Sequence, residues 1–97
     1  MASKQKQIVW TDEAIEEYRK TADYLYESWS AALAERFTDS VSELLDRLQT
    51  MPRLGQQLDW LPGVRQIMVP PYAKIYYSIA GEFIIILNLK DTRRRSE

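Results

Sequence analysis

The residues best suited to chemistry are basic side chains and a tyrosine in the C-terminal third of the chain. Arg65 begins a strand-like run, Lys74 and Tyr76 lie in the next run, and Arg93 follows the last one. Arg and Lys bind phosphate groups and stabilise the negative charge that develops during phosphoryl transfer. A tyrosine can stack on a base or transfer a proton. The sequence therefore predicts a catalytic face formed by Arg65, Lys74, Tyr76 and Arg93.

Other basic residues are expected to converge on this face, namely Arg53, Lys90, Arg94 and Arg95. A structural role is the alternative for all of them, because basic residues beside strands often protect a sheet edge. Arg65 shares one face of its strand with the apolar Ile67 and Val69, so it lies either at the solvent-exposed end of the strand or in a paired position. Asp91 is its expected partner in the structural interpretation.

The composition limits the chemistry. The chain contains no histidine and no cysteine. Ser-His-Asp and Cys-His catalysis, disulfides and thiolate metal sites are therefore excluded. We expect neither a cofactor nor a metal.

The length of 97 residues indicates one domain, spanning residues 1–97, with residues 1–6 and 96–97 flexible. No apolar run is long enough for a signal peptide or a membrane span, so we expect a cytoplasmic protein without membrane contact. The charge is uneven. Residues 1–50 carry six Lys and Arg against ten Asp and Glu, whereas residues 51–97 carry seven against four. This asymmetry points to an anionic partner for the C-terminal half.

Two amphipathic helices are predicted in the N-terminal half, capped by Thr11 and by Ser30. The apolar positions of the first are Ile15, Tyr18, Ala22, Leu25 and Trp29. Those of the second are Leu33, Phe37, Val41, Leu44, Leu45, Leu48 and Met51. Trp10, Trp29 and Trp60 are expected to make core contacts rather than to anchor a ligand.

Three strand-like runs follow, separated by Pro70-Pro71 and by Ala80-Gly81-Glu82. Strict alternation directs one set of side chains toward the helices: Ile75, Tyr77, Ile79, Phe83, Ile85, Leu87 and Leu89. It directs a half-apolar set to the opposite face: Gln66, Met68, Tyr76, Ile84, Ile86 and Asn88. An exposed face of this kind usually binds a partner.

With a short strand ending at Trp10 and an exposed loop over residues 52–63, the predicted order of elements is β-α-α-β-β-β. The fold class is α+β, with a helical hairpin packed on one face of a small, mainly antiparallel sheet.

The ordered features of the chain resemble the RelE/ParE superfamily of toxins from bacterial type II toxin–antitoxin modules, including plasmid stabilisation proteins. The resemblance extends over nearly all of residues 7–95. It rests on the opening strand ending in Trp10, on Ala14, Tyr18, Phe37 and Leu48 in the helices, and on Pro52-Arg53-Leu54-Gly55. It continues through Gly63-Val64-Arg65, Tyr72 before Lys74-Ile75-Tyr76-Tyr77, and Asp91-Thr92-Arg93-Arg94.

The resemblance implies a growth-inhibiting toxin neutralised by a cognate antitoxin, which we expect to bind Gln66, Met68, Ile84, Ile86 and Asn88. RelE-like toxins are metal-independent endoribonucleases that cleave mRNA on the ribosome, whereas ParE-like toxins poison DNA gyrase without being enzymes. Several RelE-type branches place a His or Tyr near the C-terminus, and this chain has neither after Tyr77. The Asp-Thr-Arg ending is closer to the ParE branch. The alternative is a non-catalytic protein-binding or RNA-binding module on the same fold.

Overall fold

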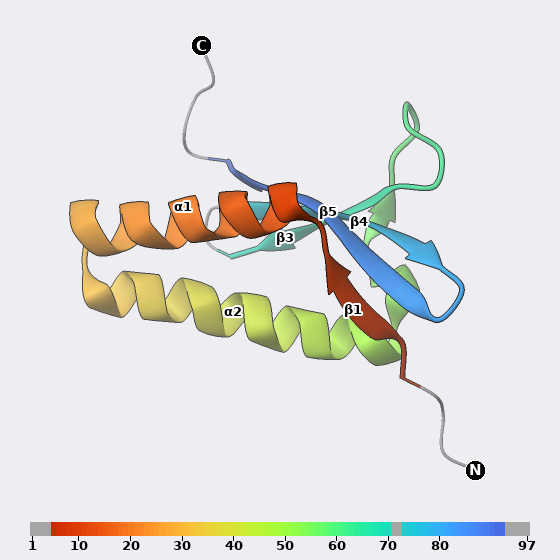
Figure 1. The fold of residues 1–97 in the computed structure, drawn as a ribbon, viewed down its shortest axis with the longest axis horizontal. Helices are drawn as coiled ribbons and strands as arrows, with labels where there is room; N and C mark the ends of the chain where they lie inside the picture. The colour runs from red at the N-terminus through yellow and green to blue at the C-terminus, as the bar shows by residue number, and fades with distance from the viewer. Residues whose placement is uncertain (1–4, 71–72, 93–97) are drawn as a thin grey trace.

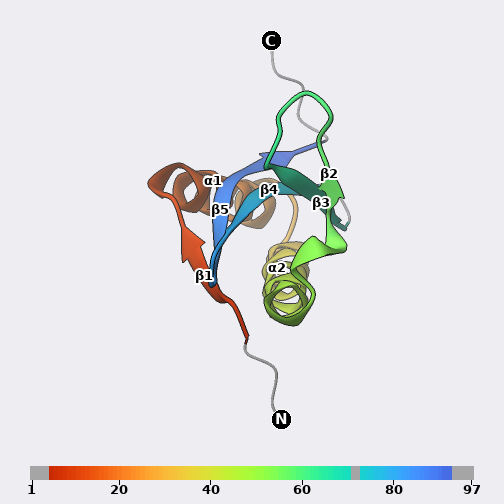
Figure 2. The ribbon, with the colours of Figure 1, turned by 90° about the vertical axis from the view of Figure 1, so that its right-hand side faces the viewer.

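The computed structural model describes residues 5–70 and 73–92. Within them, a five-stranded sheet has the order β1-β5-β4-β3-β2. Figure 2 shows β1 at one edge and β2 at the other. The strands are β1 (Gln7–Trp10), β2 (Gln56–Gln57), β3 (Arg65–Val69), β4 (Ala73–Ala80) and β5 (Phe83–Asp91). The pairing of β1 with β5 is parallel and the other pairings are antiparallel, so the predicted α+β class and order of elements are confirmed.

Two helices, α1 (Asp12–Ser28) and α2 (Ala31–Thr50), form an antiparallel hairpin against the sheet (Figure 1). Both predicted caps are confirmed, because Ala14 N donates to Thr11 Oγ1 and Leu33 N donates to Ser30 Oγ. The core lies between the helices and the sheet, and its largest fully buried side chains include Tyr77, Phe37 and Leu48. Among the described residues, no helix is long and apolar enough to cross a membrane.

The buried stripe of α1 differs from the predicted one. Ala14, Thr21 and Leu25 are buried, whereas Ile15 is 40% exposed and Trp29 is 57% exposed. The difference arises because Ala14 and the polar Thr21 were not counted among the core positions, whereas Leu25 was. On α2 the prediction is confirmed for Phe37, Val41, Leu44 and Leu48, but Met51 is exposed. Of the three tryptophans, Trp10 packs against the core and Trp60 is 73% exposed.

The predicted alternation along β5 is wrong because a β-bulge interrupts it. Tyr76 pairs with Asn88 but Tyr77 pairs with Ile86, so Leu87 is an extra residue on β5. Ile84, Ile86 and Leu89 consequently face the helices and are fully buried, although only Leu89 was expected there. The other β5 residues expected in the core are partly accessible. Phe83 is 44% exposed, and Ile85 and Leu87 are half-buried.

Residues 52–63 are more structured than an exposed loop. They begin with a 3-10 turn, η1 (Pro52–Leu54), and continue into β2, which pairs with β3. The N-terminal segment is also more ordered than predicted at Lys6. Lys6 N donates to Gln49 O, and Lys6 Nζ donates to Gly81 O at 2.8 Å. The predicted flexibility of residues 1–4 and 96–97 concerns residues outside those described.

Candidate functional site: a basic pocket beside the 3-10 turn

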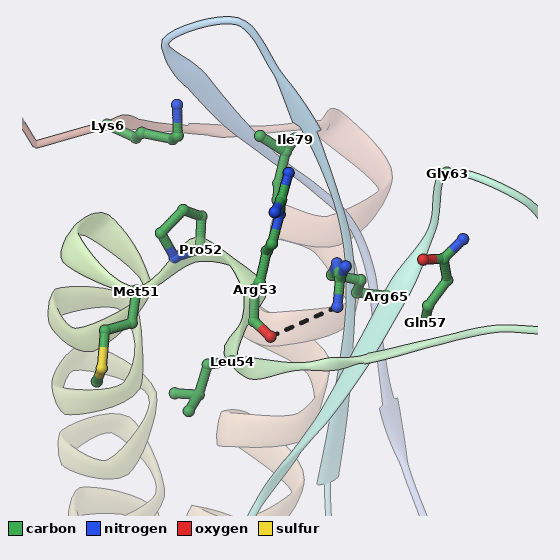
Figure 3. Close-up of a pocket in the computed structure, with 9 residues that line it drawn as sticks. All are labelled: Lys6, Met51, Pro52, Arg53, Leu54, Gln57, Gly63, Arg65 and Ile79. Carbon is green, nitrogen blue, oxygen red and sulfur yellow. Dashed lines mark hydrogen bonds between the residues drawn. The ribbon is translucent and has the colours of Figure 1, made fainter.

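An open pocket of about 800 Å³ lies where the end of α2 and η1 meet the edge of the sheet (Figure 3). Three cationic side chains line it, Lys6, Arg53 and Arg65. None of the described residues that line the pocket is acidic; the others are Met51, Pro52, Leu54, Gln57, Gly63 and Ile79. The pocket is therefore a concave surface of unbalanced positive charge, which attracts anionic groups.

A buried tyrosine hydroxyl holds η1 against the sheet. Tyr77 Oη donates to Pro52 O at 2.7 Å and accepts from Gly55 N at 2.8 Å. Burial raises the pKa of Tyr77 above its ordinary value of 10.0, and the Gly55 N–H and the Arg65 charge oppose part of that rise. Because the hydroxyl uses both its proton and a lone pair internally, Tyr77 positions the pocket wall rather than taking part in proton transfer.

Arg65 supplies a second connection between η1 and the sheet. Its guanidinium Nη1 donates to Gly55 O at 2.7 Å and lies 3.4 Å from Arg53 O. The chain at Gly55 passes so close to β4 that an added Cβ would lie 2.7 Å from Tyr77 Oη and 2.8 Å from Gln66 O. Only glycine fits at this position, and this close approach places Arg53 and Arg65 at the same pocket.

The expected partnership of Arg65 with Asp91 is wrong. Asp91 pairs with Ala73, which pairs with Val69, while Arg65 pairs with Tyr77. The two residues therefore lie at opposite ends of the meander, about 13 Å apart along the strands at ~3.3 Å per residue. Arg65 instead bonds to the backbone of η1, which no pattern within the meander indicates.

The predicted catalytic residues do not converge. Residues directly opposite in an antiparallel pair share a face, so Arg65 lies on the face of its partner Tyr77, toward the helices. Tyr76 lies opposite Gln66 and Asn88, and Lys74 lies opposite Met68 and Lys90, on the other face. The sheet thus separates Arg65 from Lys74 and Tyr76. Arg93, Arg94 and Arg95 lie outside the described residues.

The face of the sheet turned away from the core contains only part of the predicted antitoxin surface. Ile84 and Ile86 are core residues, because the bulge at Leu87 reverses the alternation before it. Gln66 and Asn88 are half-buried and Met68 is 48% exposed, all three on the outer face. We refer to Gln66, Met68, Lys74, Tyr76 and Asn88 as the outer patch. Gln66, Met68 and Lys74 also line a smaller hollow of about 400 Å³.

Sequence reasoning missed Lys6 and the role of Tyr77 at the pocket. Lys6 precedes a short strand and gives no periodic signal, and it reaches the pocket only because β1 pairs with β5, which places it near Gly81. Tyr77 was correctly placed in the core. Its hydroxyl was an available signal, because a buried tyrosine needs a polar partner.

The helical hairpin on one face of the five-stranded sheet defines a small two-layer α+β protein. A sequence model of the ParE toxin of the type II toxin–antitoxin system parDE matches residues 8–95. The chain belongs to this family and is a type II toxin. Among curated proteins, no sequence match is found.

Solved structures show the same fold. The chain is similar to a protein of the chromosomal ParDE system of P. aeruginosa, with a TM-score of 0.76, 18% identity, and coverage of 93% of this chain and 99% of that one. It is also similar to the YoeB dimer of Staphylococcus aureus, with a TM-score of 0.66, 18% identity, and coverage of 89% and 95%. The RelBE2 complex of Mycobacterium tuberculosis gives a TM-score of 0.64, 18% identity, and coverage of 90% and 98%.

Proposed function

We propose that the chain inhibits growth as a ParE-like toxin that binds and poisons DNA gyrase, and that a cognate antitoxin neutralises it. The observation that carries the proposal is a basic pocket whose described lining residues include no histidine, tyrosine or carboxylate for proton transfer, and whose lysine, Lys6, donates to Gly81 O. Arg53 and Arg65 can bind anionic groups, and the adjacent Tyr77 hydroxyl is fully engaged with Pro52 and Gly55. General acid–base catalysis requires a positioned group that gains or loses a proton near the operating pH.

The division of the predicted catalytic residues supports the same proposal. RNA cleavage by the route expected from sequence requires Arg65 to act together with Lys74 and Tyr76. The sheet lies between these groups, and the chain has no histidine to replace the tyrosine. Inhibition by binding needs no such assembly, because it requires only a surface that holds the target.

RNA cleavage remains the second candidate function, because two arginines in an acid-free pocket also suit a phosphodiester. Inducible expression of the toxin alone separates the two, with DNA supercoiling and transcript integrity followed in parallel. We expect relaxed or broken DNA while transcripts stay intact. Early transcript cleavage with unaffected supercoiling would reject gyrase as the target and support the ribonuclease.

The contribution of the pocket is tested by Arg53→Gln, since Arg53 is exposed and its side chain can be neutralised without opening the core. We expect at least about tenfold more toxin to be needed for the same growth inhibition, as for loss of a charge-assisted contact. Arg36→Gln is the matched control. It removes the same charge from an exposed position on α2, about 22 Å along the helix from Met51 at ~1.5 Å per residue. Equal effects of both variants would show that total charge, not the pocket, matters.

The antitoxin part of the proposal is supported by the solved structures with a similar fold, which include toxin–antitoxin systems. The M. tuberculosis structure is a toxin–antitoxin complex, and the P. aeruginosa structure comes from a ParDE toxin–antitoxin system. On this chain, Gln66, Met68 and Asn88 of the outer patch are the proposed contacts, because they are accessible and not covered by the helices. Co-expression with a candidate antitoxin should yield a complex with a raised Tm by mass action. Absence of both a complex and a Tm change would reject that partner.

A further inference from the structure

A hairpin projects from the edge of the sheet between β2 and β3, visible above the rest of the fold in Figure 2. Its base is fixed by the pairing of Gln57 with Arg65 and by the hydrogen bond from Leu58 N to Val64 O at 2.9 Å. Leu58 and Val64 are buried. At the turn, Val64 N donates to Leu61 O at 3.2 Å, and Gly63 adopts a positive φ of 85°. These contacts join the two sides of the loop at its base and define the turn between Leu61 and Val64.

The tip of this hairpin presents apolar side chains to solvent. Trp60 is 73% exposed, more than any other large hydrophobic side chain of the described residues, and Leu61 beside it is 44% exposed. Turn positions generally favour small or polar residues. A hydrogen-bonded turn that displays a tryptophan instead has the composition of a binding hot spot, since Trp, Tyr and Arg contribute most where proteins associate.

The hairpin and the basic pocket are continuous, because Gln57 and Gly63 of the hairpin line the pocket together with Arg53 and Arg65. The apolar tip and the cationic hollow thus form two parts of one surface. Asp59 places a carboxylate directly beside Trp60 at the exposed tip. That charge opposes a continuous polyanion such as nucleic acid or an anionic membrane at the tip. A protein surface can instead place apolar side chains against Trp60 and acidic side chains only opposite the arginines of the pocket.

We infer that Trp60 and Leu61 anchor this toxin in an apolar pocket of its protein target, a pocket bordered by acidic side chains that face Arg53 and Arg65. The inference rests on the proposed function, in which the toxin acts by binding a protein. In this inference the hairpin binds the target, and the outer patch binds the antitoxin. Trp60 and Leu61 supply buried apolar area, and the basic pocket of the toxin supplies charge complementarity and orientation.

The test compares Trp60→Ala with Tyr26→Ala, using the full chain. Both substitutions truncate an exposed aromatic residue. Tyr26 is 63% exposed and lies two residues before the end of α1, which is at the opposite end of the helical hairpin from the end of α2 (Figure 1). Four properties are measured for each variant: growth inhibition at matched expression, inhibition of the supercoiling activity of reconstituted DNA gyrase, Tm, and affinity for the antitoxin. Trp60→Phe is included, because an aromatic replacement should restore part of the activity.

For Trp60→Ala we expect the half-inhibitory toxin concentration to rise about thirtyfold, the factor that corresponds to the ~2 kcal/mol of a hot-spot residue. Tm and antitoxin affinity should stay at the wild-type values, and Tyr26→Ala should match wild type throughout. Full growth inhibition by Trp60→Ala would overturn the inference, whatever the target. So would a loss of antitoxin affinity with inhibition intact, which would assign the tip to the antitoxin.

Failure of the proposed function gives a different result. If wild-type toxin leaves gyrase unaffected, the choice of target is wrong, and the growth assay still decides whether the tip is needed. If wild type inhibits gyrase and Trp60→Ala does so equally, the target is right and the anchor is wrong. A lowered Tm for Trp60→Ala together with lost inhibition would also overturn the inference, because the tip would then support the fold.

Discussion

Tyr76 and Tyr77 are neighbours in β4, yet they belong to two surfaces built in different ways. Tyr77 is fully buried and its hydroxyl joins two backbone groups of the pocket wall. Tyr76 is half-buried on the outer patch, between Gln66 and Asn88. The pocket thus depends on specific buried polar contacts, whereas the outer patch is set by strand alternation and by the bulge at Leu87. We expect substitutions at the pocket wall to change stability, and those on the outer patch to change only binding.

The largest effect should come from Gly55→Ala, which tests how closely the pocket wall is packed. The new Cβ would lie 2.8 Å from the backbone oxygen of Gln66, which cannot move without disturbing β3. We expect a loss of about 3 kcal/mol in the free energy of unfolding, at the upper end of overpacking costs. Urea denaturation measures it, with Gln56→Ala at the adjacent exposed position as the control. A stability equal to wild type would show that the wall is loose.

Exchanging each tyrosine for phenylalanine separates the two surfaces directly. Tyr77→Phe removes two hydrogen bonds and leaves Pro52 O and Gly55 N without that partner, so about 2 kcal/mol should be lost. Tyr76→Phe should cost less than about 0.5 kcal/mol, as for most surface changes. Both values come from the same denaturation experiment. Equal losses would remove the distinction between the two faces.

Binding at the outer patch should respond to Met68→Ala, since Met68 is 48% exposed there. Truncating a moderately important contact costs about 1 kcal/mol, so the Kd for the antitoxin should rise about fivefold. Growth inhibition by the free toxin should not change. Titration calorimetry measures the affinity, and an unchanged Kd would place the antitoxin elsewhere on the toxin.

The smallest effect concerns alkaline pH. The pKa of Tyr77 is raised in the folded state by burial, so its contribution to stability is fully present below the ordinary value of 10.0 and is lost as pH rises through the folded pKa. Burial, with the Asp39 charge, also raises the pKa of Tyr18. Tyr77→Phe should therefore flatten, but not abolish, the fall of Tm as the pH rises above about 10. An unchanged slope would mean that Tyr77 does not titrate with unfolding.

The elements that local patterns specify were predictable from sequence. Thr11 and Ser30 act as caps through contacts three residues away, and the meander follows from its turn residues. The errors concern non-local geometry. The bulge at Leu87 is stabilised from outside its own strand, because Thr11 Oγ1 lies 2.9 Å from Ile86 O and 3.2 Å from Leu87 O. No alternation rule within β5 contains that information.

The candidate site was predictable only in part for the same reason. Arg65 and Arg53 were singled out by their charge, and the pocket does contain both. Their association depends on Gly55 approaching Tyr77 across 22 positions of sequence, and the role of Lys6 depends on the pairing of β1 with β5. Charge identifies candidate residues, but strand register decides the face on which each of them lies. By charge alone, Lys74 and Arg65 belong to one set of candidates. The register of β3 against β4 places them on opposite faces of the sheet.

The parallel pairing of β1 with β5 also has a consequence for biosynthesis. The earliest described strand has its sheet partner in the strand that the ribosome makes after every other described element. Ile84 and Ile86 complete the core beneath α1, so α1 emerges long before the strand against which it packs. Such distant pairing slows folding and prolongs exposure of apolar surface. We therefore expect a chain interrupted before β5 to remain unfolded, because it lacks the strand that pairs with β1 and the core side chains Ile84 and Ile86.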